Sequence, residues 1–94
     1  MLHKDHVFSN GDVYKGDWKK GEPHGKGKMI FADGIIYEGD FNNGRLTGKG
    51  KYTFADGSFY EGEVAGGALH GKGKKTYTNG TFIEGLWNDD QFVG

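Results

Sequence analysis

The stretch YEGDFNNGRLTGKGKYTFADG, which runs from Tyr37 to Gly57, decides the fold of this 94-residue chain. It combines five glycines with acids, lysines and aromatic residues at regular intervals. Glycine normally weakens a β-strand, because it loses much conformational entropy on folding and offers no side chain to pack. A strand-forming stretch with this many glycines therefore predicts a backbone of unusual shape.

The stretch is one copy of a 23-residue repeat that runs through the chain. Eighteen of the 19 glycines fall on five positions of the repeat, and the exception is Gly66. Aromatic residues follow the same period, as in Tyr14, Tyr37 and Tyr60. We expect a single domain over residues 1–94, built from a half-unit at 1–13, units near 14–36, 37–59 and 60–82, and a partial unit at 83–94.

Composition restricts the class of protein. A content of 15% aromatic residues argues against disorder, since disordered segments are usually poor in them. The net charge of −1 predicts no general attraction to nucleic acid, and the absence of cysteine excludes disulfides and cysteine zinc sites. No apolar run reaches transmembrane length, and the first residues lack the apolar core of a signal peptide. We expect a cytoplasmic location, with membrane or cytoskeletal association left open.

The sequence of each unit predicts two short strands. The predicted fold class is therefore all-β, a single twisted antiparallel sheet, or ribbon, of tandem 23-residue β-hairpin repeats. Asp-Gly or Asn-Gly between alternating segments is a strong hairpin signal. We expect residues such as 42–47 to form a longer connection within each unit. The eight predicted strands lie near residues 5–8, 13–18, 25–31, 36–41, 48–54, 59–64, 71–77 and 82–87.

A three-residue turn with glycine in the left-handed conformation sets the register of the strands on either side of it. It places Tyr52 opposite Tyr60 on one face of the sheet. Lysines meet acids on the other face, and the predicted pairs are Lys26 with Asp40, Lys28 with Glu38, Lys49 with Glu63, Lys51 with Glu61, and Lys74 with Glu84. The first unit exchanges both signs, because Lys15 takes the acid position and Asp5 the lysine position. Opposite charges in such pairs contribute about 0.2–1 kcal/mol each.

The face that carries the glycines and aromatic residues is the predicted core. The register places Gly50 opposite Gly62 on this face. A ring can lie over a glycine of an adjacent strand and shield its backbone, an arrangement called aromatic rescue. The residues expected to build this core are Tyr14, Trp18, Phe31, Tyr37, Phe41, Phe54, Tyr60, Tyr77 and Trp87, with Gly16, Gly39, Gly62 and Gly85.

The repeated pattern Tyr-x-Gly-x-Trp/Phe, followed by Gly, His-Gly-x-Gly and Asp/Asn-Gly, resembles the MORN (membrane occupation and recognition nexus) repeat. The segment YKGDWKKGEPHGKGKMIFADG, residues 14–34, looks like a close match, and the resemblance covers nearly the whole chain. It implies a ribbon of β-hairpins that serves protein binding, self-association or membrane attachment. The last unit departs from the pattern, because Ile83 replaces tyrosine, Asp90 replaces glycine and Val93 replaces histidine.

Histidines and carboxylates do not indicate catalysis. His24 and His70 lie four predicted strands apart, roughly 19 Å at the usual strand spacing, which is too far for one metal ion. The acids form a regular ladder, whereas acid–base catalysis needs two carboxyl groups in one pocket with separated pKa values. We therefore expect no enzyme activity, no metal and no cofactor.

The predicted binding residues lie on the charged face, where later units depart from the repeat. Ile36, Phe59, Phe82 and Leu86 give this face an apolar strip, and contiguous exposed apolar surface usually marks an interface. The terminal strand at 82–87 adds an edge with which another strand could pair. We expect a non-enzymatic scaffold that binds a protein partner and forms a homodimer.

Two alternatives stay open from the sequence. A peripheral phospholipid-binding module would use basic residues that are not neutralised by acids, and the candidates are Lys19, Lys20, Arg45 and Lys72. Five of the six ladder lysines face an acid, and only Lys72 faces an apolar residue, Leu86. The other alternative is an accessory fragment of a larger enzyme.

Overall fold

The computed structural model describes residues 5–94, and within them the chain is all-strand. Residues 1–4 of the predicted half-unit lie outside the described residues. Nothing in the described part forms a helix that could cross a membrane. The strands are β1 (His6–Val7), β2 (Val13–Lys19), β3 (Glu22–Ile30), β4 (Ile36–Asn42), β5 (Arg45–Thr53), β6 (Phe59–Ala65), β7 (Ala68–Thr76), β8 (Phe82–Asn88) and β9 (Gln91–Phe92).

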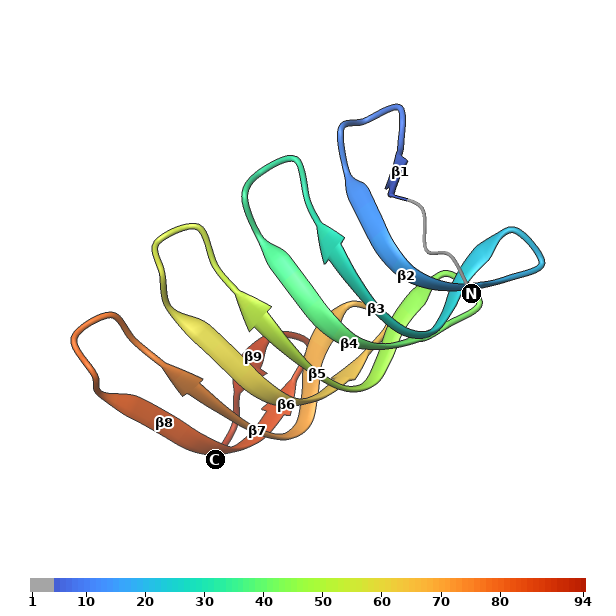
Figure 1. The fold of residues 1–94 in the computed structure, drawn as a ribbon. Helices are drawn as coiled ribbons and strands as arrows, with labels where there is room; N and C mark the ends of the chain where they lie inside the picture. The colour runs from blue at the N-terminus through green and yellow to red at the C-terminus, as the bar shows by residue number, and fades with distance from the viewer. Residues whose placement is uncertain (1–4) are drawn as a thin grey trace.

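These strands form one open antiparallel sheet in which the spatial order follows the chain order from β1 to β9. Successive hairpins stack side by side, and each long strand curves along its length (Figure 1). The predicted all-β ribbon of tandem hairpins is therefore confirmed.

The predicted register between units is also confirmed. Tyr52 faces Tyr60, and Lys51 faces Glu61. The turn between them is the expected three-residue loop, in which Gly57 has a φ of 94°. The exchanged charges of the first unit pair as predicted, with Lys15 Nζ 3.6 Å from Asp5 Oδ2.

The connection within each unit is shorter than predicted. It is a two-residue turn with positive φ at both positions, 51° at Asn43 and 81° at Gly44, as in a type I′ hairpin. The strands β3, β5 and β7 therefore begin three residues earlier than expected. A turn with positive φ at Asp89 and Asp90 also adds the unpredicted ninth strand.

Each strand that opens a unit is sharply bent. The ring centroids of Tyr37 and Phe41 lie 5.3 Å apart, whereas positions four residues apart in a straight strand are separated by about 13 Å. A β-bulge interrupts the β4–β5 register between Gly39 and Phe41, and bulges bend strands. The bend closes toward the aromatic residues, so we call their face the inner face and the opposite one the outer face.

Glycines form an unbroken row across the sheet at the bend. The paired residues from β2 to β8 are Gly16, Gly27, Gly39, Gly50, Gly62, Gly73 and Gly85. A Cβ atom on Gly39 would lie 2.5 Å from the Cα of Gly50, and one on Gly50 would lie 2.5 Å from Cζ of Tyr37. The tyrosine ring thus occupies the space that a side chain would need, which is the predicted covering of glycine by an aromatic ring.

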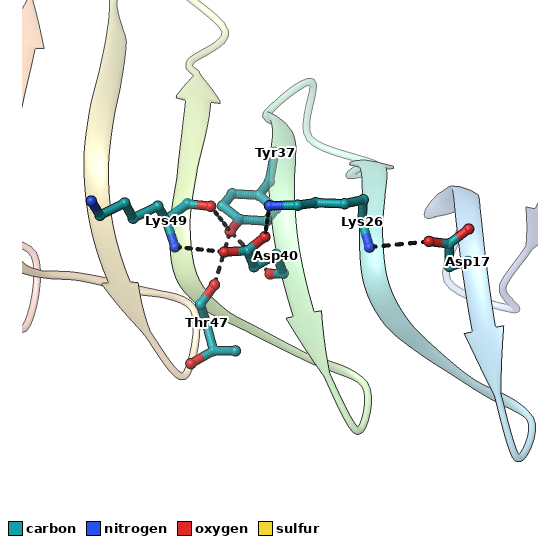
Figure 2. A network of polar contacts seen from close by, with 6 residues as sticks. All are labelled: Asp17, Lys26, Tyr37, Asp40, Thr47 and Lys49. Carbon is teal, nitrogen blue, oxygen red and sulfur yellow. Dashed lines mark hydrogen bonds and ion pairs between the residues drawn. The ribbon is translucent and has the colours of Figure 1, made fainter.

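Tyrosine hydroxyls bind the backbone at the bulges. Tyr37 Oη donates to the carbonyl oxygen of Asp40 at 3.1 Å (Figure 2). The equivalent bonds from Tyr14 to Asp17 and from Tyr60 to Glu63 are 2.7 Å long. Burial, followed by the nearby Asp40 charge, raises the pKa of Tyr37 from 10.0 to about 12.

The inner face buries most of the predicted core aromatics. The side chains of Tyr14, Tyr37 and Tyr60 are fully buried, Phe41 and Trp87 are buried, and Phe31 and Phe54 are partly buried against them. Two predicted core residues are more exposed, Trp18 at 37% and Tyr77 at 38%. Trp18 lies in the unit 14–36 and Tyr77 in the unit 60–82, near the two ends of the sheet, where fewer neighbouring hairpins are available to cover them.

Replacing Gly50 with alanine should lower the free energy of unfolding by about 1–3 kcal/mol, the usual cost of forcing atoms into a packed core. The buried ring of Tyr37 occupies the space that the new methyl group needs. Thermal unfolding followed by circular dichroism measures the loss. In a Tyr37→Ala background the same substitution should cost far less, and strictly additive losses would contradict this packing.

Tyr37→Phe should lower stability at pH 7 by about 0.5–1.5 kcal/mol through loss of a hydrogen bond. The substitution should also weaken the dependence of the free energy of unfolding on pH above pH 10. The unfolded chain releases the Tyr37 proton near pH 10 and the folded chain near pH 12, so this contribution is complete below pH 10 and is lost as the pH rises. Urea unfolding at pH 7 and pH 11 measures both effects. An unchanged alkaline slope would show that Tyr37 does not carry it.

Candidate binding surface on the outer face

A mostly apolar row crosses the outer face, with one residue from each strand from β1 to β8. We call it the outer apolar row, and its members are Val7, Val13, Ile30, Ile36, Thr53, Phe59, Thr76 and Phe82. The row exists because the residue before each inner-face tyrosine position is apolar in every unit, and strand alternation turns it outward.

The outer apolar row is most exposed near its ends. Val7 is 66% exposed and Phe82 is 54% exposed, whereas Ile36 and Phe59 are half-buried. The row therefore presents partly exposed apolar side chains, interrupted by Thr53 and Thr76, on an otherwise charged face. Exposed apolar surface is the property expected of an interface.

Three of the four predicted binding residues, Ile36, Phe59 and Phe82, belong to this row. Leu86 does not, because it lies four positions further along β8 and faces Lys72, with Glu84 between it and Phe82. Leu86 is nevertheless 49% exposed. Phe82 and Leu86 are thus two separate apolar positions on β8, and Leu86 is not part of the predicted strip with Ile36 and Phe59.

Lysines of the neighbouring charged row partly cover the phenylalanines. Lys51 Nζ lies 4.6 Å from the centroid of the Phe59 ring, and Lys74 Nζ lies 4.2 Å from that of Phe82. These distances fit cation–π contacts. Lysines that face acids across the strands therefore also contact rings along the sheet, a use that the charge pattern alone did not predict.

Asp40 shows a second role for the acids. Its carboxylate forms an ion pair with Lys26 Nζ, and Oδ2 accepts a hydrogen bond from the backbone N–H of Lys49 at 3.2 Å (Figure 2). The Lys26 ammonium and then this N–H hold the pKa of Asp40 below its usual value.

The same backbone contact recurs in the other units. Lys26 N–H donates to Asp17 at 3.4 Å, and Lys72 N–H donates to Glu63 at 2.6 Å. Sequence reasoning missed this contact, although an acid recurs nine residues before each of these lysines. The carboxylates at these positions therefore hold the next strand in place.

A groove on the outer face crosses the glycine row between β5 and β8. Its lining residues are Lys49, Glu61, Gly62, Glu63, Lys72, Gly73, Lys74, Glu84, Gly85 and Leu86. Three lysines alternate with three glutamates, so the groove does not present a field of one sign. Such a mixture favours a polypeptide that carries both charges over a phosphate group.

The basic residues predicted for phospholipid do not form one cluster. Lys19 and Lys20 lie at the β2–β3 turn, where Lys19 faces Glu22, and Arg45 follows the β4–β5 turn. Lys72 instead lines the outer-face groove. Lys19, Lys20 and Arg45 therefore lie at neighbouring turns, which are joined by a hydrogen bond from the N–H of Gly44 to the carbonyl oxygen of Pro23. Lys72 lies apart from these three residues.

His24 contributes to the contact between two neighbouring turns. The Nδ1 atom of His24 accepts a hydrogen bond from the backbone N–H of Asn43 at 3.4 Å. Between residues 5 and 94, no group of three or more potential ligands is arranged to hold a metal ion.

Comparison with known proteins gives one family. The family model described as MORN repeat matches residues 14–36, 37–59 and 60–82. A search of curated proteins found no match.

The exchanged pair of the first unit provides a test of the charge ladder. A double-mutant cycle with Asp5→Ala and Lys15→Ala should give a favourable coupling of about 0.2–1 kcal/mol. Lys15 also faces Lys28 on its other side, so a matched cycle on that pair should give an unfavourable coupling. Chemical denaturation at low salt measures both. Couplings of the same sign would contradict the ladder.

Proposed function

This chain belongs to the MORN repeat family, and on that premise we propose that it is a non-enzymatic scaffold that binds protein partners and forms a homodimer through the outer apolar row. MORN repeats are in general a non-catalytic repeat module. The single observation that supports this proposal most strongly is the outer apolar row itself.

The size of the outer face suits a stable interface. The molecule measures 39 Å by 23 Å along its two longest axes, and stable interfaces bury about 800 Å² on each partner. The outer apolar row would form the centre of the contact, and the charged rows beside it would form the polar rim that interfaces usually have.

A second copy is a chemically suitable occupant of this face. Two-fold symmetric dimers use the same patch on both subunits, so the patch must complement itself. The outer face carries apolar residues with lysines and glutamates of both signs, such as Lys51 and Glu61 in adjacent strands. Two such faces can therefore meet without a large repulsion between fields of the same sign.

The arrangement of acids supports a scaffold rather than an enzyme. In each unit a carboxylate accepts a hydrogen bond from a backbone N–H of the following strand, and the three carboxylates are those of Asp17, Asp40 and Glu63. These carboxylates connect neighbouring strands in successive repeats, which is a structural role. They are not gathered in a single pocket, as the carboxyl groups of an active site would be.

Phe82→Asp should convert the dimer into a monomer, because it places a charge on the exposed end of the outer apolar row. Size-exclusion chromatography with light scattering measures the mass over a range of concentrations. The control is Ala55→Asp, which adds the same charge at an exposed turn outside the row. A wild-type chain that stays monomeric at high concentration would contradict the homodimer, and so would equal disruption by both variants.

A further inference from the structure

A cavity of about 260 Å³ opens on the inner face, with walls from β5 and β7. Strands flank it on both sides, because Lys75 pairs with Tyr60 in β6 and with Ile83 in β8. Four of the side chains that line the cavity are apolar or aromatic, and two carry opposite charges. These side chains are Ile35, Tyr52, Phe54, Leu69, Lys75 and Asp90.

The cavity exists because Lys75 interrupts the repeat on the inner face. Lys75 takes the position that Tyr52 has one unit earlier. The Tyr52 side chain is buried, and its hydroxyl donates a hydrogen bond to the carbonyl oxygen of Gly67. Asp90 takes the position of Gly67 one unit later. Since lysine has no ring, the space that a tyrosine would fill beside Asp90 is left open.

The two charged groups of the cavity do not pair with each other. Lys75 Nζ lies 4.8 Å from the centroid of the Phe54 ring and 5.2 Å from that of Tyr77, as in cation–π contacts. Within the described part of the chain, this half-buried ammonium forms no ion pair and donates no hydrogen bond. Asp90 is exposed, and its Oδ1 accepts the backbone N–H of Leu69 at 2.8 Å.

We propose that this cavity binds a small aromatic molecule with a carboxylate at one end of the ring and a hydroxyl group at the other, as in 4-hydroxyphenylacetate. The ring occupies the space that a tyrosine fills in the preceding unit, between Tyr52 and Leu69. The carboxylate pairs with Lys75 Nζ, and the hydroxyl group donates a hydrogen bond to the carboxylate of Asp90. This site lies on the inner face, so it does not depend on the proposed dimer.

The volume and the walls suit one aromatic ring. A cavity of about 150 Å³ with apolar walls is enough to bind benzene. Binding sites usually combine such walls with a small number of polar groups that fix the orientation of the ligand. Here the charge of Asp90 excludes the reverse orientation, because that orientation would place two carboxylates together.

The environment of the two charges favours an anion over a cation. Lys75 is half-buried and has no counter-ion, so a carboxylate gains a strong hydrogen bond from it. An ammonium ion would have to bind Asp90, which is exposed and already accepts a backbone N–H. Tyramine, which has the same ring with an ammonium group in place of the carboxylate, is therefore the matched control ligand.

Isothermal titration calorimetry of the full chain with 4-hydroxyphenylacetate tests the proposal. Binding should be saturable with one site, and amide NMR shifts should concentrate on residues 52–54, 67–69 and 75. The probe 4-methylphenol, which lacks the carboxylate, should bind roughly 3- to 30-fold more weakly, because it loses a hydrogen bond to a charged group. Tyramine should bind no more tightly than 4-methylphenol.

Three variants assign the binding to the cavity. Lys75→Tyr restores the ring of the preceding unit, so it should fill the cavity and abolish binding while thermal unfolding shows an intact fold. Lys75→Met introduces the residue found at the equivalent Met29 and removes only the ammonium. It should weaken 4-hydroxyphenylacetate to the level of 4-methylphenol and leave 4-methylphenol unchanged. The control Lys74→Met removes the adjacent ammonium on the outer face and should change neither ligand.

Several outcomes would overturn the proposal. They are the absence of saturable binding, NMR shifts located elsewhere, tighter binding of tyramine than of 4-hydroxyphenylacetate, and unchanged binding by a folded Lys75→Tyr variant. Equal effects of Lys75→Met and Lys74→Met would also overturn it, and this comparison decides the matter if Lys75→Tyr does not fold.

Discussion

The contact between a tyrosine ring and a glycine of the next strand is the constraint on which the rest of this structure depends. Tyr37 lies where a Cβ atom on Gly50 would be, and its hydroxyl binds the carbonyl oxygen of Asp40 at the bulge. The ring is buried only because the strand bends around it, and the strand can bend so tightly only because the paired positions are glycines. The same contact recurs between Tyr14 and Gly27 and between Tyr60 and Gly73.

This bend divides the sheet into two faces with different uses. The inner face holds the rings and supplies most of the burial that stabilises so small a domain. The outer face is left with the charged rows and the outer apolar row, which are not needed to fill the core. The exposed apolar residue Phe82 and the acid Glu84 both lie on this outer face.

Sequence reasoning predicted the elements that depend on strict periodicity. The register and the charge pairs followed from a turn with glycine at one position, and the exchange of Asp5 and Lys15 supported that register. The predicted strand starts are wrong because Asn43-Gly44 forms a two-residue turn. Residues 45–47, which the pattern places in a longer connection, already belong to β5. The repeat pattern also does not predict how exposed each side chain is, because the exposure of Trp18 depends on how many hairpins surround it. The pattern likewise did not show that Lys51 would lie over a ring or that Asp40 would hold a backbone N–H.

Proton NMR of the glycine Hα atoms tests the central contact most directly. A proton held against an aromatic face is shifted upfield by the ring current, so the Hα resonances of Gly27, Gly50 and Gly73 should lie well upfield of their random-coil positions. Replacing Tyr37 with leucine should return the Gly50 resonance toward its random-coil position and leave that of Gly73 unchanged. Random-coil shifts for all three glycines in the folded wild-type protein would contradict the account.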